Sequence, residues 1–260
     1  YALEHGLPVL QPVKMKDPAF VEELASYEAD LQVVVAFRML PEVVWAMPKY
    51  GTFNVHAALL PKYRGAAPIN WAVINGETET GVTTFFLDHD IDTGRIINRK
   101  TFAIPDDADV EYVYDGLMEL GAELALETVE KVLKGDGVVE SKEQSDYADD
   151  KELPVAPKIF KETCEINWNQ SAKKVYDFVR GLSPYPGAWG NVMLNDKQMM
   201  LKVFKTQKTD KTTILEPGIL CAEKGHLYVS CADSLLEILQ LQQSGKKRMS
   251  AKDFINGQRL

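Results

Sequence analysis

The sequence predicts an α/β domain with a mostly parallel sheet, followed by a small domain built as a β-barrel. Strand-like and helix-like segments alternate up to residue 134, a polar stretch with two prolines follows, and short strands dominate the remainder. Such alternation is typical of a parallel sheet with crossover connections. Several short strands with few helices favour a small barrel, a fold that often binds oligonucleotides. We therefore expect a first domain at 1–136, a linker at 137–157 and a second domain at 158–260.

The elements of the first domain are predicted from local signals. Asp17 followed by Pro18 indicates a helix start, with a capping carboxylate and a proline at the first helical position. The run 32–37, which is apolar after Gln32, predicts a strand covered on both faces. Hydrophobic periodicity predicts further strands at 52–56 and 81–87, a short helix at 68–75 and a long helix at 109–134.

The second domain carries turn and cap signals. Asn195-Asp196 lies between two apolar runs and indicates a β-hairpin. Ser171 is placed to cap a helix over 171–180, and Ser250 with Asp253 resembles a capping box. Further strands are expected at 227–230 and 235–241.

Composition excludes several classes of protein. The 260 residues are 45% hydrophobic, which is enough for a large core. No apolar run approaches the roughly 20 residues that span a bilayer, and no signal peptide is visible, so we expect no membrane partner. The three cysteines are widely spaced, which favours a reducing cytoplasm over a disulfide framework or a zinc site.

The net charge of −9 is unevenly distributed. Residues 1–156 hold 13 Lys and Arg against 28 Asp and Glu, whereas residues 157–260 hold 16 against 10. A basic half is typical of a protein that binds a polyanion, although lysine-rich surfaces also serve solubility alone. The sequence therefore leaves nucleic acid open as a partner of the second domain.

One stretch is dense in groups that can do chemistry. Asn54 and His56 are two residues apart on a predicted strand, so their side chains share one side of the sheet. Open α/β sheets bind ligands beyond the carboxyl ends of their strands, where His56 lies. A loop with Pro61, Gly65 and Pro68 follows and allows a close approach of the backbone to a ligand.

A second stretch, 88–94, is rich in aspartate and follows the strand predicted at 81–87. Asp at alternate positions is typical of an EF-hand loop, but the sixth and twelfth positions here are Thr93 and Arg99, which excludes that calcium site. A turn stabilised by Asx side chains remains the simpler interpretation. Because Asp92 lies near a second strand end, it can converge with His56 on one crevice.

These two stretches together resemble the folate-dependent formyltransferase family. The signature of that family is Asn-x-His, Leu-Leu-Pro, Arg-Gly and a Pro, with an Asp 36 residues after the His, and the sequence has each part. The matching residues are Asn54-Val55-His56, Leu59-Leu60-Pro61, Arg64-Gly65, Pro68 and Ile91-Asp92-Thr93-Gly94. The resemblance implies a Rossmann-like catalytic domain with an OB-like C-terminal barrel. It also implies roughly one further βαβ unit ahead of Tyr1.

Other motifs resemble the branch of the family that acts on methionyl-tRNA. They are found at 64–72, 79–83, 161–168 and 183–188, and the most particular is the ending Gly245-Lys246-Lys247-Arg248-Met249-Ser250. This resemblance implies initiator methionyl-tRNA and the donor 10-formyltetrahydrofolate as partners, in a cytoplasmic monomer without a metal. Two alternatives share the first domain: an aminosugar-nucleotide formyltransferase and a formyltetrahydrofolate hydrolase. A non-catalytic RNA-binding module is the third alternative.

The resemblance also implies roles for particular residues. Asn54, His56 and Asp92 form the catalytic set. The expected folate contacts are Arg38, Met39, Leu40, Ala58, Leu59, Leu60, Pro61, Asp88 and Asp90. The basic residues expected to contact tRNA phosphates are Lys202, Lys205, Lys208, Lys246, Lys247, Arg248 and Lys252.

Overall fold

A computed structural model describes residues 1–36, 39–148 and 152–258. The chain divides into two compact units, which are described separately. The first consists of Tyr1–Pro61, Val82–Lys100 and Glu119–Glu152, and the second of Lys62–Gly81, Thr101–Met118 and Leu153–Leu260. No helix within the described ranges is long and apolar enough to cross a membrane.

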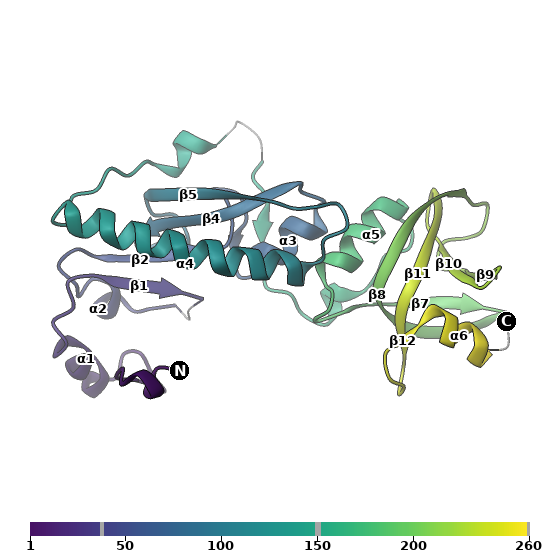
Figure 1. Cartoon of the computed structure of the whole chain (residues 1–260), viewed down its shortest axis with the longest axis horizontal. Helices are drawn as coiled ribbons and strands as arrows, with labels where there is room; N and C mark the ends of the chain where they lie inside the picture. The colour runs from purple at the N-terminus through teal and green to yellow at the C-terminus, as the bar shows by residue number, and fades with distance from the viewer. Residues whose placement is uncertain (37–38, 149–151, 259–260) are drawn as a thin grey trace. The chain divides into compact units, whose positions relative to one another are not determined.

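The first unit is built on a four-stranded sheet with the order β1-β2-β4-β5 (Figure 1). Its strands are β1 (Gln32–Val35), β2 (Thr52–His56), β4 (Glu79–Phe86) and β5 (Ile96–Ala103). β1 and β2 are parallel, but β2 and β4 are antiparallel, so the sheet is mixed and the prediction of a mostly parallel sheet is wrong. Alternating strands and helices do not record in which direction the chain re-enters a sheet. The connection at residues 57–78 is long enough for either direction, and it brings the chain back antiparallel to β2.

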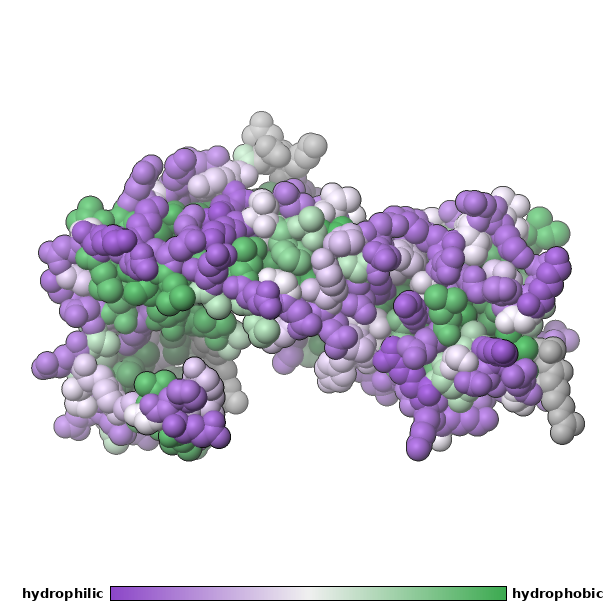
Figure 2. Space-filling view, in the orientation of Figure 1, coloured by the Kyte–Doolittle hydropathy of each residue, from purple (hydrophilic) through white to green (hydrophobic). Residues whose placement is uncertain are grey.

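The strand β1 differs from its prediction in burial. Val33 is 43% exposed and Val35 is 63% exposed, so the strand is not covered on both faces. Figure 2 shows hydrophobic residues at the surface of the part of the chain that holds β1, β2 and α4. The apolar sequence correctly predicts a strand here, but it does not reveal that β1 lies at the edge of the described sheet.

The two longest helices of the first domain lie where the sequence predicts them. In α1 (Pro18–Ala25), the side chain of Asp17 accepts a hydrogen bond from the backbone N–H of Ala19. The long helix α4 (Val110–Lys134) buries the predicted side chains of Leu124 and Val132. At Gly121 the helix comes so close to the sheet that a Cβ would lie 3.6 Å from Val55 of β2. Two shorter elements are η1 (Leu3–His5) and α2 (Glu42–Trp45).

The second unit contains a six-stranded antiparallel sheet with the order β7-β8-β11-β10-β9, and β12 pairs with β11. The strands are β7 (Ala188–Leu194), β8 (Lys197–Thr212), β9 (Leu220–Glu223), β10 (His226–Ser230), β11 (Ser234–Gln243) and β12 (Met249–Ser250). Asn195 and Asp196 have φ values of 48° and 61°, which confirms the predicted hairpin turn. The mostly β second domain is confirmed, but no closed barrel is found among the described residues, where an isolated bridge links Met193 of β7 to Ile219, the residue before β9.

The helices of the second unit pack against this sheet and against each other. Ser171 caps α5 (Ala172–Gly181), and Ser250 bonds Asp253 at the start of α6 (Ala251–Gln258), as predicted. The side chain of Asn70 in α3 (Pro68–Ile74) donates a hydrogen bond to the carbonyl of Gly181, 2.8 Å away. The remaining elements of the second unit are β3 (Arg64–Gly65), which pairs with β6 (Val155–Ala156), and η3 (Glu162–Cys164). The element η2 (Gln144–Tyr147) belongs to the first unit.

Candidate active site

His56 is the last residue of β2, the strand between β1 and β4, and Asn54 lies two residues before it. Asn54 and His56 are 4% and 6% exposed, respectively, and they share one side of the strand because side chains alternate along it. The carbonyl oxygen of the Asn54 side chain is buried and has no hydrogen-bond partner among the described residues. A buried acceptor without a donor lowers the free energy of unfolding. Asn54 therefore does not stabilise the fold through this oxygen, which suggests a functional role for the side chain.

Asp92 lies beside His56, although 36 residues separate them in the sequence. The Oδ2 atom of Asp92 is 3.9 Å from Nδ1 of His56, and the two side chains are 9% and 6% exposed. The ring of Phe85 meets the His56 ring edge to face, with 6.4 Å between centroids. A carboxylate that faces one ring nitrogen orients the imidazole.

The backbone around Asp92 is held in an uncommon conformation. Asp92 has a φ of 56°, in the left-handed region that non-glycine residues rarely adopt. The side chain of Gln144 donates hydrogen bonds to the carbonyls of Asp92 and Gly94, at 2.8 and 3.0 Å. At Gly94, a Cβ would lie 1.7 Å from the carbonyl oxygen of Phe86, so only glycine fits there. Gln144 was missed in the sequence because it lies in the predicted linker and belongs to no motif.

The loop expected to contact folate is packed against the neighbouring strand. Thr83 donates a hydrogen bond to the carbonyl of Ala58 at 2.6 Å and accepts one from the N–H of Leu60 at 3.1 Å. The side chains of Ala58 and Leu60 are fully buried, whereas Leu59 is half-buried. Pro61 is also buried. Of this loop, the Leu59 side chain is therefore the most accessible to a ligand.

The remaining expected folate contacts lie on two other segments of the first unit. Met39 is 77% exposed and Leu40 is half-buried, whereas Arg38 lies outside the described residues. Asp88 and Asp90 are exposed in the turn after β4, where Asp88 accepts hydrogen bonds from the Asp90 N–H and the Thr93 hydroxyl. Among the described residues, no three His, Cys, Asp or Glu side chains are grouped to hold a metal ion.

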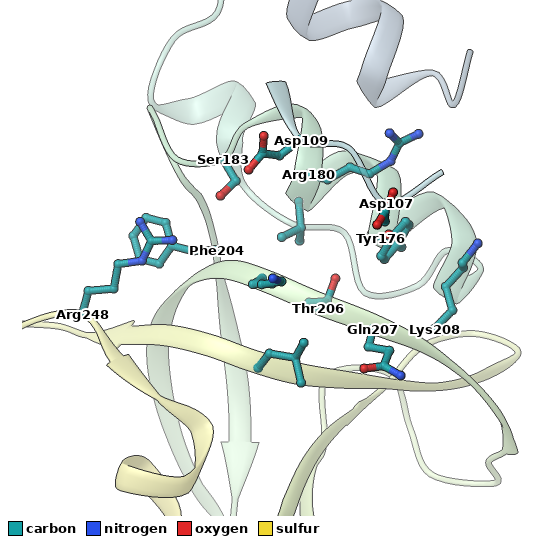
Figure 3. A pocket seen from close by; sticks show the side chains of 13 residues that line it. Asp107, Asp109, Tyr176, Arg180, Ser183, Phe204, Thr206, Gln207, Lys208 and Arg248 are labelled. Atoms are coloured by element: carbon teal, nitrogen blue, oxygen red, sulfur yellow. The ribbon is translucent and has the colours of Figure 1, made fainter. Parts of the chain in front are cut away.

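Three of the basic residues expected to contact tRNA line one pocket of the second unit, with a volume of about 360 Å³ (Figure 3). They are Lys205, Lys208 and Arg248. The Arg248 guanidinium lies over the Phe204 ring, 4.1 Å from its centroid. Lys208 forms an ion pair with Asp106, which holds the pKa of the Asp106 carboxyl below its usual value. The Lys208 charge is therefore partly neutralised within the protein.

The other four basic residues are separate from that pocket. Lys202 is half-buried, and its ammonium lies 3.4 Å from the carbonyl of Pro186. Lys246, Lys247 and Lys252 are exposed on the turn before β12 and at the start of α6. The structure thus brings together part of the predicted basic set and distributes the rest over the strand β8, the turn before β12 and the start of α6.

Comparisons with known proteins agree on the class. A family model described as formyl transferase matches residues 2–129, and one described as formyl transferase, C-terminal domain, matches residues 158–259. A methionyl-tRNA formyltransferase of Parabacteroides distasonis is 56% identical over 99% of this chain and 80% of its own length. One from Bacteroides fragilis is 53% identical over 99% of this chain and 79% of its own.

Solved structures share the fold at low identity. HypX from Aquifex aeolicus in complex with tetrahydrofolic acid has a TM-score of 0.65 at 23% identity. It covers 92% of this chain, which spans only 41% of that protein. An N-formyltransferase from Helicobacter canadensis, in complex with folinic acid and dTDP-3-aminofucose, has a TM-score of 0.61 at 17% identity and covers 95% of this chain and 81% of its own. The chain therefore belongs to the formyl transferase family, within its methionyl-tRNA formyltransferase group.

Proposed function

We propose that the chain transfers the formyl group of 10-formyltetrahydrofolate to the α-amino group of methionyl initiator tRNA, with Asn54, His56 and Asp92 as catalytic residues. The observation that carries this proposal is the buried pair of His56 and Asp92, with Asn54 buried two residues before His56 on the same side of β2. The high identity to methionyl-tRNA formyltransferases supports the choice of acceptor.

The first chemical step is attack of the amine on the formyl carbon. A free α-amine has a pKa near 7.7–8.0, so part of it is neutral and nucleophilic at pH 7. The attack converts the formyl oxygen to an oxyanion. The Asn54 amide and the ring nitrogen of His56 that faces away from Asp92 can both donate hydrogen bonds to it, and one such donor lowers the barrier by about 3–4 kcal/mol.

Asp92 has two roles in this proposal. It holds the His56 ring in orientation, and it accepts the proton that the attacking amine loses, through water. The bond between the formyl carbon and the folate nitrogen then breaks, the nitrogen takes up a proton, and the methionyl amine keeps the formyl group. The residues that fix Asp92, Gln144 and Gly94, are positioning residues.

Walls for the folate donor are proposed on three segments. Arg38, Met39 and Leu40 form one wall, Ala58–Pro61 a second, and Asp88 with Asp90 a third. The Thr83 hydroxyl already forms hydrogen bonds with the backbone of Ala58 and Leu60. We therefore propose the Leu59 side chain and the exposed turn at Asp88 as the main contacts for the folate donor. An accessible apolar side chain and a polar turn together suit a flat, polar ring system with one apolar face.

The second domain is proposed to bind the tRNA through its basic residues. We propose catalytic, linker and tRNA-binding segments at 1–136, 137–157 and 158–260, with the C-terminal strands arranged as an OB-like barrel. The bridge between Met193 and Ile219 supports such a barrel. We further propose that the protein acts as a monomer in the cytoplasm.

The test is a formyl-transfer assay with three acceptors: methionyl initiator tRNA, an aminosugar nucleotide and water. We expect transfer to the tRNA alone. Transfer only to the sugar, or release of formate without an acceptor, would overturn the proposed function. Asp92→Asn is expected to lower kcat, and a variant with the full rate would remove Asp92 from the mechanism.

A further inference from the structure

A second pocket in the second unit, with a volume of about 500 Å³, has not been assigned a role so far. It lies between the loop that follows β3, the segment before η3, the loop before β7, and the strands β7 and β8. We name it the lysine–aromatic pocket. Its lining residues are Ala66, Ala67, Asn70, Lys158, Ile159, Phe160, Lys161, Cys164, Tyr185, Pro186, Gly187, Trp189 and Lys202.

The charge of this pocket is of one sign. Three lysines, Lys158, Lys161 and Lys202, line it, and no carboxylate of the described residues does. None of the three forms an ion pair with a described residue. The pocket of Figure 3 differs, because its lining includes Asp107 and Asp109 as well as lysines. The lysine–aromatic pocket is therefore the more favourable of the two for a polyanion.

Two aromatic rings in the pocket are exposed. Tyr185 is 82% exposed and Phe160 is 54% exposed. The third, Trp189, is half-buried and fixed by its indole N–H, which donates to the carbonyl of Lys161 at 2.8 Å. The Lys158 ammonium lies 5.5 Å from the centroid of the Phe160 ring, so charge and ring face are adjacent. Exposed rings beside lysines are the combination with which proteins stack unpaired bases and hold their phosphates.

We propose that the lysine–aromatic pocket binds unpaired nucleotides at the single-stranded 3′ end of the acceptor tRNA, stacking bases on Tyr185 and Phe160. This rests on the proposed function, which makes a tRNA the acceptor. A duplex does not fit the proposal, because its bases are stacked on each other and are not available to aromatic rings in a concave site.

The experiment compares two RNAs: uncharged initiator tRNA, and the same tRNA with its unpaired 3′ nucleotides removed. We expect Tyr185→Ala and Phe160→Ala each to raise the Kd for intact tRNA roughly tenfold, because stacking of one base has about this effect. Neither variant should change the Kd for trimmed tRNA. Tyr185→Phe keeps the ring and should bind both RNAs as the parent chain does.

The salt dependence of tRNA binding by lysine variants provides a second, independent test of the pocket. Each phosphate contact with a single strand contributes about 0.7 to the slope of log K against log salt. Lys158→Gln should therefore lower the slope by about 0.7 with intact tRNA and leave it unchanged with trimmed tRNA. Lys246→Gln, outside the pocket lining, should lower the slope with both RNAs. Tyr114 is 56% exposed and also lies outside the pocket lining, so Tyr114→Ala is the matched control for the aromatic variants. It should change neither the Kd nor the salt slope with either RNA.

The proposal would be overturned if the aromatic variants lost affinity equally for intact and trimmed tRNA, or if neither variant lost affinity for intact tRNA. Thermal unfolding of each variant separates loss of the fold from loss of a contact. Failure of this proposal is distinguishable from failure of the proposed function. An enzyme that formylates methionyl-tRNA, but whose Tyr185→Ala variant binds both RNAs normally, contradicts only the pocket. A chain that fails to formylate tRNA, but whose variants distinguish the two RNAs, contradicts only the function.

Discussion

Replacing Asn54 with leucine is expected to stabilise the fold and to remove most of the activity. Asn54 is 4% exposed, and its side-chain oxygen has no hydrogen-bond partner in the described ranges. A buried acceptor without a donor costs about 1–3 kcal/mol. Leucine keeps the branched outline of the side chain and removes the acceptor. Its methyl groups are larger than the amide atoms, and this crowding offsets part of the gain.

We therefore expect the free energy of unfolding to rise by about 1 kcal/mol, which corresponds to roughly 2–4 °C in Tm. The same substitution removes a proposed donor to the oxyanion. Loss of such a donor lowers kcat by about a hundredfold to a thousandfold. Stability and activity are thus expected to change in opposite directions, which a purely structural residue would not produce.

The assay combines thermal unfolding with formyl transfer to methionyl-tRNA at saturating donor. Thr80→Val is the matched control, because the Thr80 hydroxyl is also buried without a partner among the described residues, and the side chain is 3% exposed. That variant should be stabilised by a similar amount at an unchanged kcat. A lower Tm together with normal kcat in Asn54→Leu would refute the reasoning and make Asn54 a structural residue.

Three further outcomes are expected. Gly94→Ala should lower kcat at least tenfold, because its Cβ would lie 1.7 Å from the Phe86 carbonyl oxygen and must displace the Asp92 turn. In the same steady-state assay, Gly257→Ala should leave kcat unchanged, because no atom lies within 4 Å of its added Cβ. Cys164 and Cys231 are each 1% exposed and should resist a thiol reagent at pH 8 until the protein is unfolded. Burial also raises the pKa of the Cys231 thiol to about 12, which keeps this thiol protonated. Rapid reaction of either cysteine in the native state would contradict their burial. The affinity for tRNA should fall steeply as salt is raised, and a flat response would exclude phosphate contacts by the basic residues.

The local elements of the fold were largely predictable, whereas the direction of the strands was not. Asp17, Ser171 and Ser250 cap their helices as their residue types indicate, because a cap depends only on a few neighbouring atoms. The antiparallel pairing of β2 with β4 depends on the path of the chain between them, which periodicity does not record. The strand β5 was missed because its sequence, Ile96–Ala103, mixes polar and apolar residues without regular alternation.

The same distinction applies to the functional residues. His56 and Asn54 share a side because strand geometry requires it, and the 36-residue spacing to Asp92 follows a family motif, so all three could be found in the sequence. No comparable rule predicts from the sequence which basic residues contact the tRNA. Lys208 has the same sequence signal as Lys205, yet Asp106 neutralises it, and that contact joins residues 102 positions apart. The exposed rings of Tyr185 and Phe160 carry no charge signal at all. A polyanion surface depends on which charges remain unpaired after folding, so it has to be derived from tertiary contacts rather than from counts of lysine.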